Sequence, residues 1–361
     1  GGGTKSSGNF LRKKKYASFT AALAAAFLCC GSGNIWAADL VVNDPTEITA
    51  SSDWIENNNV YALKDSSNGN QIAISGKDTS DDVTWPGIAG GYSRAEDDSV
   101  TANENVMTLS DVTLGASGYV YGGYSYSAEK NATSNKNTVN LTDVAMGSSK
   151  RIYGGASNAY KENATSNENI VNLIDVAMGI NCYVYGGDSR AYEESPIVTA
   201  NKNTVILTDV TASSSSFYGG SAVGGESAMA SENTVILNNT DIEKSCKVFG
   251  GFTETNRGNE IATANKNTVS LSDVTIGSSG QVYGGRSYSS YQGGSSAQAT
   301  ASKNVITLTN VSMGSNSKVY GGYAYSPGEA TVNENVVHIY DNFGTENTSV
   351  KAKIYGGYVD G

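Results

Sequence analysis

The chain of 361 residues is poor in proline, histidine and charged side chains. It has 4 Pro and 1 His, and only 16% of its residues are Asp, Glu, Lys or Arg. Scarce Pro, with Gly that follows no three-residue period, excludes a collagen helix. A low share of Ala, Glu, Lys, Leu and Arg, without heptads, excludes a coiled coil. Regularly spaced Val, Ile, Leu and Tyr argue against a long disordered region.

The charge is divided along the chain. After residue 37 there are 19 Lys and Arg against 35 Asp and Glu. Nucleic-acid binding needs clustered cations, so this acidic body argues against a nucleic-acid partner and against adsorption to anionic lipid. Beyond the leader no run of 18 apolar residues exists, which argues against direct membrane insertion as a helix.

Residues 1–37 read as an export leader. A basic run over residues 12–15 precedes a mostly apolar stretch over 16–30, and small residues follow at Ala37 and Ala38. This order predicts a secretory signal peptide that is cleaved after Ala37. The apolar stretch is too short to cross a bilayer, which takes about 20 residues.

A regular internal repeat dominates the rest of the sequence. Nine Gly-Gly pairs recur at intervals of 31 to 37 residues, most often 32, and eight of them follow an aromatic residue. The pairs begin at Gly90, Gly122, Gly154, Gly186, Gly219, Gly250, Gly284, Gly321 and Gly356. An Asn precedes each pair, 17 residues away in six of eight clear cases, and Asn70 is a degenerate further copy. One half of each unit therefore has a nearly fixed length. The other half varies and is predicted to be an outward loop, as over 288–302.

The fixed half contains two or three short strands. In residues 138–142 Val139 and Leu141 alternate with polar residues, Asp143 interrupts, and Val144 and Met146 resume the alternation. A further strand is predicted over 151–153.

These units are too small to fold alone, so stacking must bury their apolar side chains. We predict an all-β fold, a parallel β-solenoid of the right-handed β-helix type with about nine units of ~32 residues, over residues 70–361. Residues 38–69 are predicted to be its N-terminal cap. The right-handedness is predicted only from the known preference of β crossover connections for the right-handed form. The unit allows one or two coils. A β-propeller, with blades of about 40–50 residues, and a hairpin array are the alternative folds.

Stacking turns like positions into ladders. Two apolar ladders are predicted to face the core: Val120, Ile152, Val184, Phe217, Val248, Val282, Val319 and Ile354 in one, and Val139, Leu141, Val171, Leu173, Val205, Leu207, Val235, Leu237, Val269 and Leu271 in the other.

The aromatic ladder is predicted to face outward or line a corner, with stacked rings and hydroxyls in water: Tyr121, Tyr153, Tyr185, Tyr218, Phe249, Tyr283, Tyr320 and Tyr355. The Asn ladder is predicted at a bend with left-handed backbone and amide bonds to the next coil: Asn105, Asn137, Asn169, Asn203, Asn233, Asn267, Asn304 and Asn335. The Gly-Gly pairs suit either a positive φ or a close approach of neighbouring backbone.

An acidic ladder lies six residues after the Asn: Asp111, Asp143, Asp175, Asp209, Asp273 and Asp341, with Asn239 and Asn310 in the other two units. Its repetition favours a structural corner, because a catalytic pair is normally unique. Calcium bound between coils is the alternative, and no other cofactor is expected. His338 has no second His or Cys cluster near it in the sequence. We therefore interpret it as a solvent-exposed strand residue and not as a catalytic base or zinc ligand. No catalytic or metal site is assigned. Cys182 and Cys246 occupy the same position two units apart, too far for a disulfide, and are expected to stay reduced.

The repeated Asn-Thr-Val-x-Leu-x-Asp-Val and Val-Tyr-Gly-Gly-Tyr-Ser segments, seen at residues 137–144 and 120–125, together with the leader, resemble the repeat-rich passenger region of bacterial autotransporters and related large surface adhesins. The resemblance covers roughly residues 39–361. It implies export, passage through an outer-membrane translocator barrel expected in the full-length chain, and display at the bacterial cell surface or secretion.

Three functions stay open at this point. The first is a non-catalytic binding rod for adhesion or aggregation, with a surface glycan or a protein on another cell as partner and avidity from repeated weak sites. The second is a β-helix enzyme that cleaves polysaccharides, which needs a unique acidic cluster. The third is an inert stalk for a domain beyond Gly361.

Overall fold

A computed structural model describes most of the repeat region. The described residues are 39–42, 54–57, 60–63, 67–75, 87–193, 196–255, 260–289, 296–341 and 352–360. The predicted leader over residues 1–37 and much of the predicted cap lie outside them. The described residues contain β-strands and turns and no helix, so none of them forms a helix that could cross a membrane. They belong to one compact unit, Trp36–Gly361.

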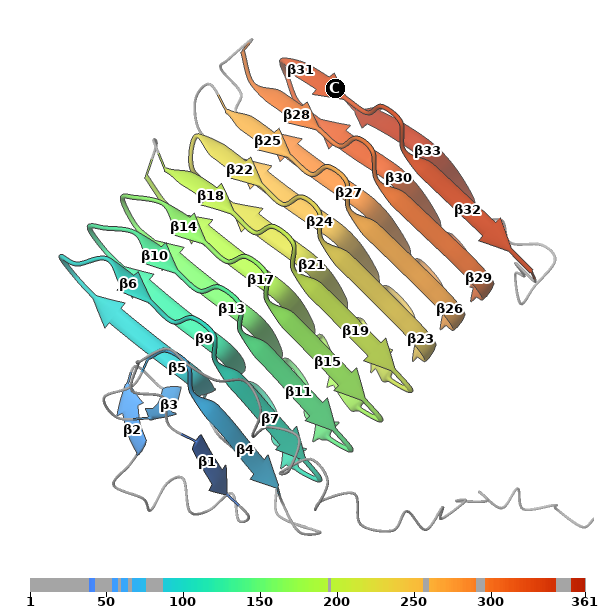
Figure 1. Cartoon of the computed structure of the whole chain (residues 1–361). Helices are drawn as coiled ribbons and strands as arrows, with labels where there is room; N and C mark the ends of the chain where they lie inside the picture. The colour runs from blue at the N-terminus through green and yellow to red at the C-terminus, as the bar shows by residue number, and fades with distance from the viewer. Residues whose placement is uncertain are drawn as a thin grey trace, which may run out of the picture. The chain divides into compact units, whose positions relative to one another are not determined.

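The strands form three sheets, which we call A, B and C (Figure 1). Sheet A has two arms on either side of a corner. Its strands are β1 (Asp39–Val42), β4 (Gln71–Ser75), β7 (Val106–Ser110), β8 (Thr113–Leu114), β11 (Thr138–Thr142), β12 (Ala145–Met146), β15 (Ile170–Ile174), β16 (Ala177–Ile180), β19 (Thr204–Thr208), β20 (Thr211–Ser213), β23 (Thr234–Ile242), β26 (Thr268–Ile276), β29 (Val305–Met313) and β32 (Val336–Tyr340).

Sheet B carries the Gly-Gly pairs, and sheet C is built from short strands. Sheet B contains β2 (Trp54–Asn57), β3 (Val60–Leu63), β5 (Gly87–Ala95), β9 (Tyr119–Ser127), β13 (Arg151–Ala159), β17 (Tyr183–Ala191), β21 (Ser216–Val223), β24 (Lys247–Thr255), β27 (Gln281–Ser289), β30 (Lys318–Tyr325) and β33 (Lys353–Asp360). Sheet C contains β6 (Val100–Thr101), β10 (Ala132–Thr133), β14 (Ala164–Thr165), β18 (Ile197–Thr199), β22 (Ser227–Met229), β25 (Ile261–Thr263), β28 (Gln298–Thr300) and β31 (Glu329–Thr331).

Each repeat makes one coil that visits sheets A, B and C in turn. Strand β9 pairs with β13 in parallel, with Tyr121 opposite Tyr153 and Gly123 opposite Gly155. The same register continues from β5 to β33, so about eight turns connect nine stacked Gly-Gly strands (Figure 1). The predicted parallel β-solenoid is confirmed, with one coil per unit. Its handedness stays a prediction.

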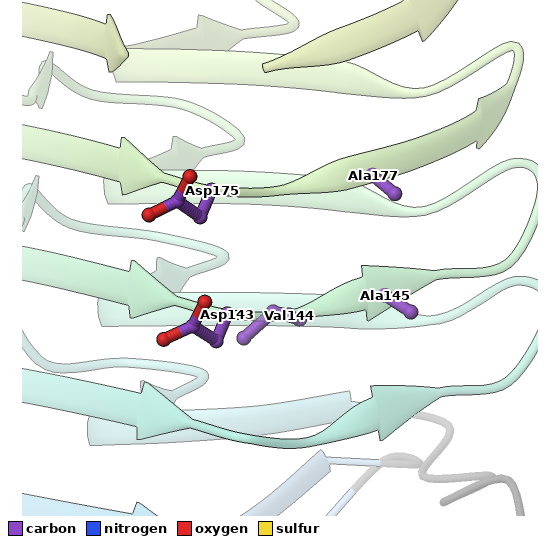
Figure 2. A pocket seen from close by; sticks show the side chains of 5 residues that line it. All are labelled: Asp143, Val144, Ala145, Asp175 and Ala177. Carbon is purple, nitrogen blue, oxygen red and sulfur yellow. The ribbon is translucent and has the colours of Figure 1, made fainter. Parts of the chain in front are cut away.

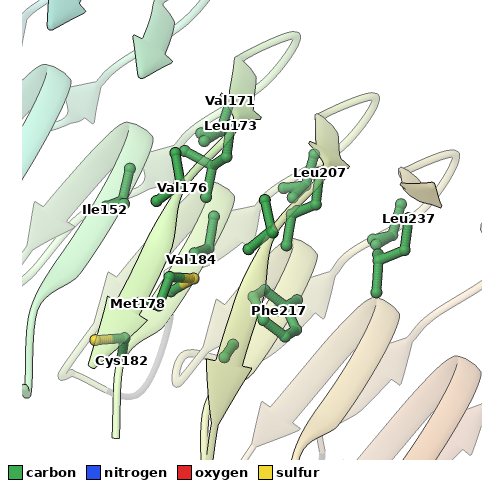
Figure 3. Close-up of a cluster of buried hydrophobic side chains, with 14 of the residues drawn as sticks. Ile152, Val171, Leu173, Val176, Met178, Cys182, Val184, Leu207, Phe217 and Leu237 are labelled. Carbon is green, nitrogen blue, oxygen red and sulfur yellow. The ribbon is translucent and has the colours of Figure 1, made fainter. Parts of the chain in front are cut away.

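The apolar ladders form the main core, as predicted. Every member named above is at most 2% exposed except Ile354, which is 38% exposed in the last coil, where no further coil of the described chain covers it. Figure 3 shows Val171, Leu173, Val184 and Phe217 pointing into this core from neighbouring coils. Each such side chain contributes about 1.5–3 kcal/mol when it is buried, which offsets part of the cost of ordering the backbone.

The Asn ladder runs beside this core. The backbone N–H of Asn137 and its Nδ2 both donate to Oδ1 of Asn169 on the next coil, at 2.9 and 3.0 Å. Equivalent bonds link the ladder from Asn70 to Asn335. The predicted bonds between coils are confirmed. The predicted left-handed backbone is wrong for the Asn itself, because the residue before it takes the positive φ, as at Lys136 with φ 57°.

The Gly-Gly pairs face this Asn ladder. A Cβ on Gly187 would lie 2.4 Å from the carbonyl oxygen of Ser166 and 2.5 Å from Nδ2 of Asn203, and one on Gly186 would lie 2.4 Å from the oxygen of Gly219. Close approach of backbone therefore requires these glycines, and neither residue of the pair has a positive φ. The strand continues through the pair, so the strand predicted over 151–153 extends to Ala159.

The variable half of the unit is only partly a loop. In residues 288–302, predicted to be an outward loop, the end of β27 and the whole of β28 are extended, and Ala299 is buried. The Ala and Ser side chains beside sheet C are small enough to pack close to sheet B. The sequence lacked a long apolar run there, and the short strand was therefore missed.

The residue before each ladder Asn alternates in charge along much of the stack. The series is Glu104, Lys136, Glu168, Lys202, Glu232, Lys266, Lys303 and Glu334, and every member has a positive φ. Three pairs come within 3.6–3.9 Å of each other: Lys136 with Glu104, Lys266 with Glu232 and Lys303 with Glu334. Alternation places opposite charges on adjacent coils and favours the observed register.

Candidate functional site

The aromatic ladder lies on the outer face of sheet B, opposite the apolar core. Neighbouring rings of the ladder stack with centroids 4.6–5.0 Å apart from Tyr121 to Tyr355. The predicted stacking is confirmed. The predicted exposure is wrong, because Tyr121, Tyr153, Tyr185, Phe249, Tyr283 and Tyr320 are only 1–7% exposed.

A second aromatic row accounts for part of this burial. It consists of Tyr92, Tyr124, Phe252, Tyr323 and Tyr358, three residues after the ladder position. Its rings lie tilted or edge-on against the ladder, at 59° for Tyr121 with Tyr124 and 80° for Tyr320 with Tyr323. Both rows share one face because the two inward-facing glycines between them break the usual two-residue alternation.

Burial keeps the ladder phenols neutral. It raises the pKa of Tyr218 and of Tyr283 to about 12, and it raises the pKa of Tyr121, Tyr153 and Tyr185 strongly. A neutral phenol both donates and accepts a hydrogen bond. At the edge of the face the Tyr323 hydroxyl donates to the Asp360 carboxylate at 3.0 Å.

Arginine side chains lie over these rings. Arg286 is 5.3–5.9 Å from the centroids of four rings, those of Phe252, Tyr283, Tyr288 and Tyr323. Arg94 lies 4.4 Å from the Tyr126 ring, and Arg151 lies 5.7–5.8 Å from two more. Cation–π contacts hold the guanidinium groups on the face without neutralising their charge.

One acidic residue is embedded in the same face. Asp188 is 4% exposed, and its Oδ2 accepts from Nε of Arg190 at 2.8 Å. Its Oδ1 has no hydrogen-bond partner within the described part of the chain. The Asp188 carboxylate also raises the pKa of Arg190. This position therefore offers a buried, unused acceptor beside a cation.

The Asp ladder is a structural corner of sheet A, as predicted. All six Asp of the ladder, and Asn239 and Asn310, have φ between 46° and 57°, a conformation that Asn and Asp tolerate better than most residues. Asn310 donates to Asp273 at 2.6 Å, and Asn239 donates to Asp209, so the Asn members relieve repulsion between carboxylates.

A shallow hollow lies between two of these corners. Asp143, Val144, Ala145, Asp175 and Ala177 line it, and the two carboxylates lie one above the other on adjacent coils (Figure 2). Partial burial and the charge of Asp111 raise the pKa of Asp143. No group of three or more His, Cys, Asp or Glu side chains suited to a metal occurs among the described residues. Calcium binding at the Asp ladder therefore stays a prediction. The hollow offers two carboxylates, from Asp143 and Asp175, as ligands.

The remaining candidates stand apart from one another. His338 is exposed on β32 and stacks beside Tyr340 at 5.9 Å, which agrees with a solvated strand residue. Cys182 and Cys246 are buried with free thiols, as expected. Lys150 takes the position of Cys182 one coil earlier. It is 2% exposed, and burial lowers its pKa to about 8, a feature the sequence analysis missed.

A second ladder next to the Asn positions was also missed. The side chain of Asn103 accepts from the backbone N–H of Asn135, and the same bond recurs along most of the stack. The signal was present in the sequence as Asn-Lys-Asn or Asn-Glu-Asn triplets, in which both Asn recur with the repeat.

Comparison of the chain with protein-family models, with curated proteins and with solved structures gives no match.

Proposed function

We propose that this chain is an exported, non-catalytic binding rod that acts in adhesion or aggregation at a bacterial cell surface. The leader and the repeat resemblance support export and display. The observation that carries the binding role is the outer face of sheet B, where aromatic rings stack from coil to coil and seven of the nine Gly-Gly strands also contain an Arg or Lys. Repeated weak contacts along a rigid rod give avidity without one dominant site.

The non-catalytic assignment follows from repetition. The Asp corners recur from coil to coil, whereas a catalytic pair of carboxylates is normally unique. In the full-length protein an outer-membrane translocator barrel would carry the rod across the membrane. The partner we propose is a glycan or a protein on another cell.

Adhesion of coated microspheres tests this function. Two variants with equal charge loss provide the comparison. The face variant carries Arg151→Gln, Lys247→Gln, Lys318→Gln and Lys353→Gln on sheet B. The paired-lysine variant carries Lys130→Gln, Lys136→Gln, Lys161→Gln and Lys266→Gln, at lysines that each form an ion pair in the turns.

We expect microspheres coated with the purified chain or with the paired-lysine variant to adhere to bacterial or host cells. Those coated with the face variant should adhere weakly. Circular dichroism verifies that each protein is folded. Failure of the folded unsubstituted chain to adhere to any cell surface would contradict the proposed function.

A further inference from the structure

The cations of the described strands are confined to sheet B. Strands β5 to β33 of this sheet contain Arg94, Arg151, Arg190, Lys247, Arg286, Lys318 and Lys353, against three acidic residues. None of the described strands of sheets A and C contains Lys or Arg. A chain with a net charge of −11 therefore presents one sheet face with an excess of positive charge.

Most of these cations form no ion pair with a carboxylate of the described residues. The five are Arg151, Lys247, Arg286, Lys318 and Lys353. They are exposed or half-buried on the outer face. Charge complementarity thus favours an anionic ligand.

The spread of the cations favours a long ligand. They occur from β5 to β33, eight strand spacings that cover about 38 Å at ~4.8 Å per strand. A small anion would contact one or two of them. A linear polymer that runs along the stack can contact most of them at once.

The aromatic rings argue against a nucleic acid. Single-stranded nucleic acid binds by stacking its bases on free ring faces. Here the ladder faces are already covered by one another, at 4.6–5.0 Å between centroids. What the face offers besides charge is hydrogen bonding, from phenol hydroxyls and from polar side chains such as Asn158 and Gln281.

Asp188 points to a ligand with hydroxyl groups. Its buried Oδ1 lacks a partner among the described residues, and an acceptor of this kind is satisfied only by a donor. Arg190 covers the carboxylate and is 36% exposed, so its guanidinium can turn towards an anionic group and leave the Asp188 oxygens to hydroxyls. Single-stranded DNA and polyglutamate lack hydroxyl groups along their length, whereas sugars carry them on every ring.

We infer that the outer face of sheet B binds a linear acidic polysaccharide, with carboxylate or sulfate groups on the Arg and Lys side chains and sugar hydroxyls on Asp188 and the Tyr hydroxyls. This inference rests on the proposed binding function and names its ligand class. The polymer runs across successive coils.

Biolayer interferometry with the purified chain tests this ligand class. The immobilised probes are polygalacturonate, heparin, neutral dextran, single-stranded DNA and polyglutamate. We expect binding to polygalacturonate or heparin that weakens with added salt, and little binding to the other three. The face variant should bind about tenfold more weakly, as the loss of four exposed ion pairs allows, while the paired-lysine variant binds like the unsubstituted chain.

An Asp188→Asn variant separates hydroxyl recognition from plain charge attraction. Removal of a negative charge should raise affinity for any polyanion if charge alone matters. We instead expect binding of the acidic polysaccharide to weaken about threefold, because an acceptor for sugar hydroxyls is lost. Tighter binding of this variant, or equal binding of the unsubstituted chain to DNA and polyglutamate, would overturn the inference.

Failure of the inference is distinguishable from failure of the proposed function. If the chain binds none of the acidic polysaccharides but coated microspheres still adhere to cells, the ligand class is wrong and the binding role stands. If neither binding nor adhesion occurs, both are wrong.

Discussion

Two populations of cations in this molecule have different surroundings. In the turns, Lys130, Lys136, Lys161, Lys266 and Lys303 each lie 2.7–3.9 Å from a Glu carboxylate of a neighbouring coil. On sheet B, five cations have no carboxylate partner among the described residues. Ion pairs between adjacent coils join opposite charges and help to specify register, whereas the five cations on the aromatic face keep their charge unneutralised by any carboxylate of the described residues. The difference supports the proposal made above, in which the turns serve the fold and the sheet B face binds the ligand.

We expect the largest effect, a loss of stability, from a substitution in the Asn ladder at the turns. Asn203→Ala removes the acceptor for both the backbone N–H and Nδ2 of Asn169, which are buried. We expect a loss of about 2–4 kcal/mol in the free energy of unfolding, because buried donors are left unsatisfied. Urea unfolding followed by circular dichroism measures it.

Asn172→Ala is the matched control, on the preceding coil. Asn172 is half-buried on the outside of sheet A and donates one bond to Asn140 at 2.8 Å. We expect a loss of at most about 1 kcal/mol. Equal losses in the two variants would show that the buried Asn ladder does not hold the coils together.

A second prediction concerns the aromatic face of sheet B, which we expect to lose stability at alkaline pH. Burial raises the pKa of Tyr218 and of Tyr283 to about 12 from the ordinary value of 10.0. Their folded-state pKa is raised, so the stability they contribute is complete below pH 10 and is lost as the pH rises towards 12. Tyrosinate absorbance and circular dichroism, recorded across this range, should change together. Ionisation of all tyrosines near pH 10 without unfolding would mean that the rings are solvated.

The smallest expected effect concerns the Asp corners. Burial and Asp111 raise the pKa of Asp143, so its ionised form costs stability above that pKa and the cost disappears in acid. We expect Asp143→Asn to raise stability at pH 7 by about 0.2–1 kcal/mol, the size of a like-charge contact, and to have no such effect near pH 3.

Asp273→Asn serves as its control, because Asn310 already donates to Asp273 at 2.6 Å. This substitution should bring no gain in the urea midpoint at pH 7. A gain of the same size at both positions would indicate a general preference for Asn at the corner instead of relief of charge repulsion.

The repeat made the stacking predictable, because a fixed distance between Asn and Gly-Gly leaves each coil a single register. The apolar ladders followed from simple alternation. The outer face of sheet B was predictable only as far as the Tyr ladder. Beyond it, the two inward-facing glycines shift the alternation by one, so the positions of Tyr124, Arg190 and Arg286 could not be assigned to a face.

Burial of the Tyr ladder was also beyond the sequence analysis. It depends in part on contacts with the second aromatic row, whose position follows from the same shift. The left-handed residues before the Asn were unexpected because Lys and Glu rarely adopt a positive φ. There the bonds that both flanking Asn make to adjacent coils fix the backbone of the residue between them.

The most direct test measures stability and polygalacturonate binding on the same two variants of equal charge loss. The account predicts that the face variant keeps its free energy of unfolding within about 1 kcal/mol, the size of the lost Arg151 cation–π contacts, and loses most of its binding. The paired-lysine variant should keep its binding and lose some stability, since its glutamates are left unpaired. Equal loss of binding in both variants would contradict the distinction between the turns and the sheet B face.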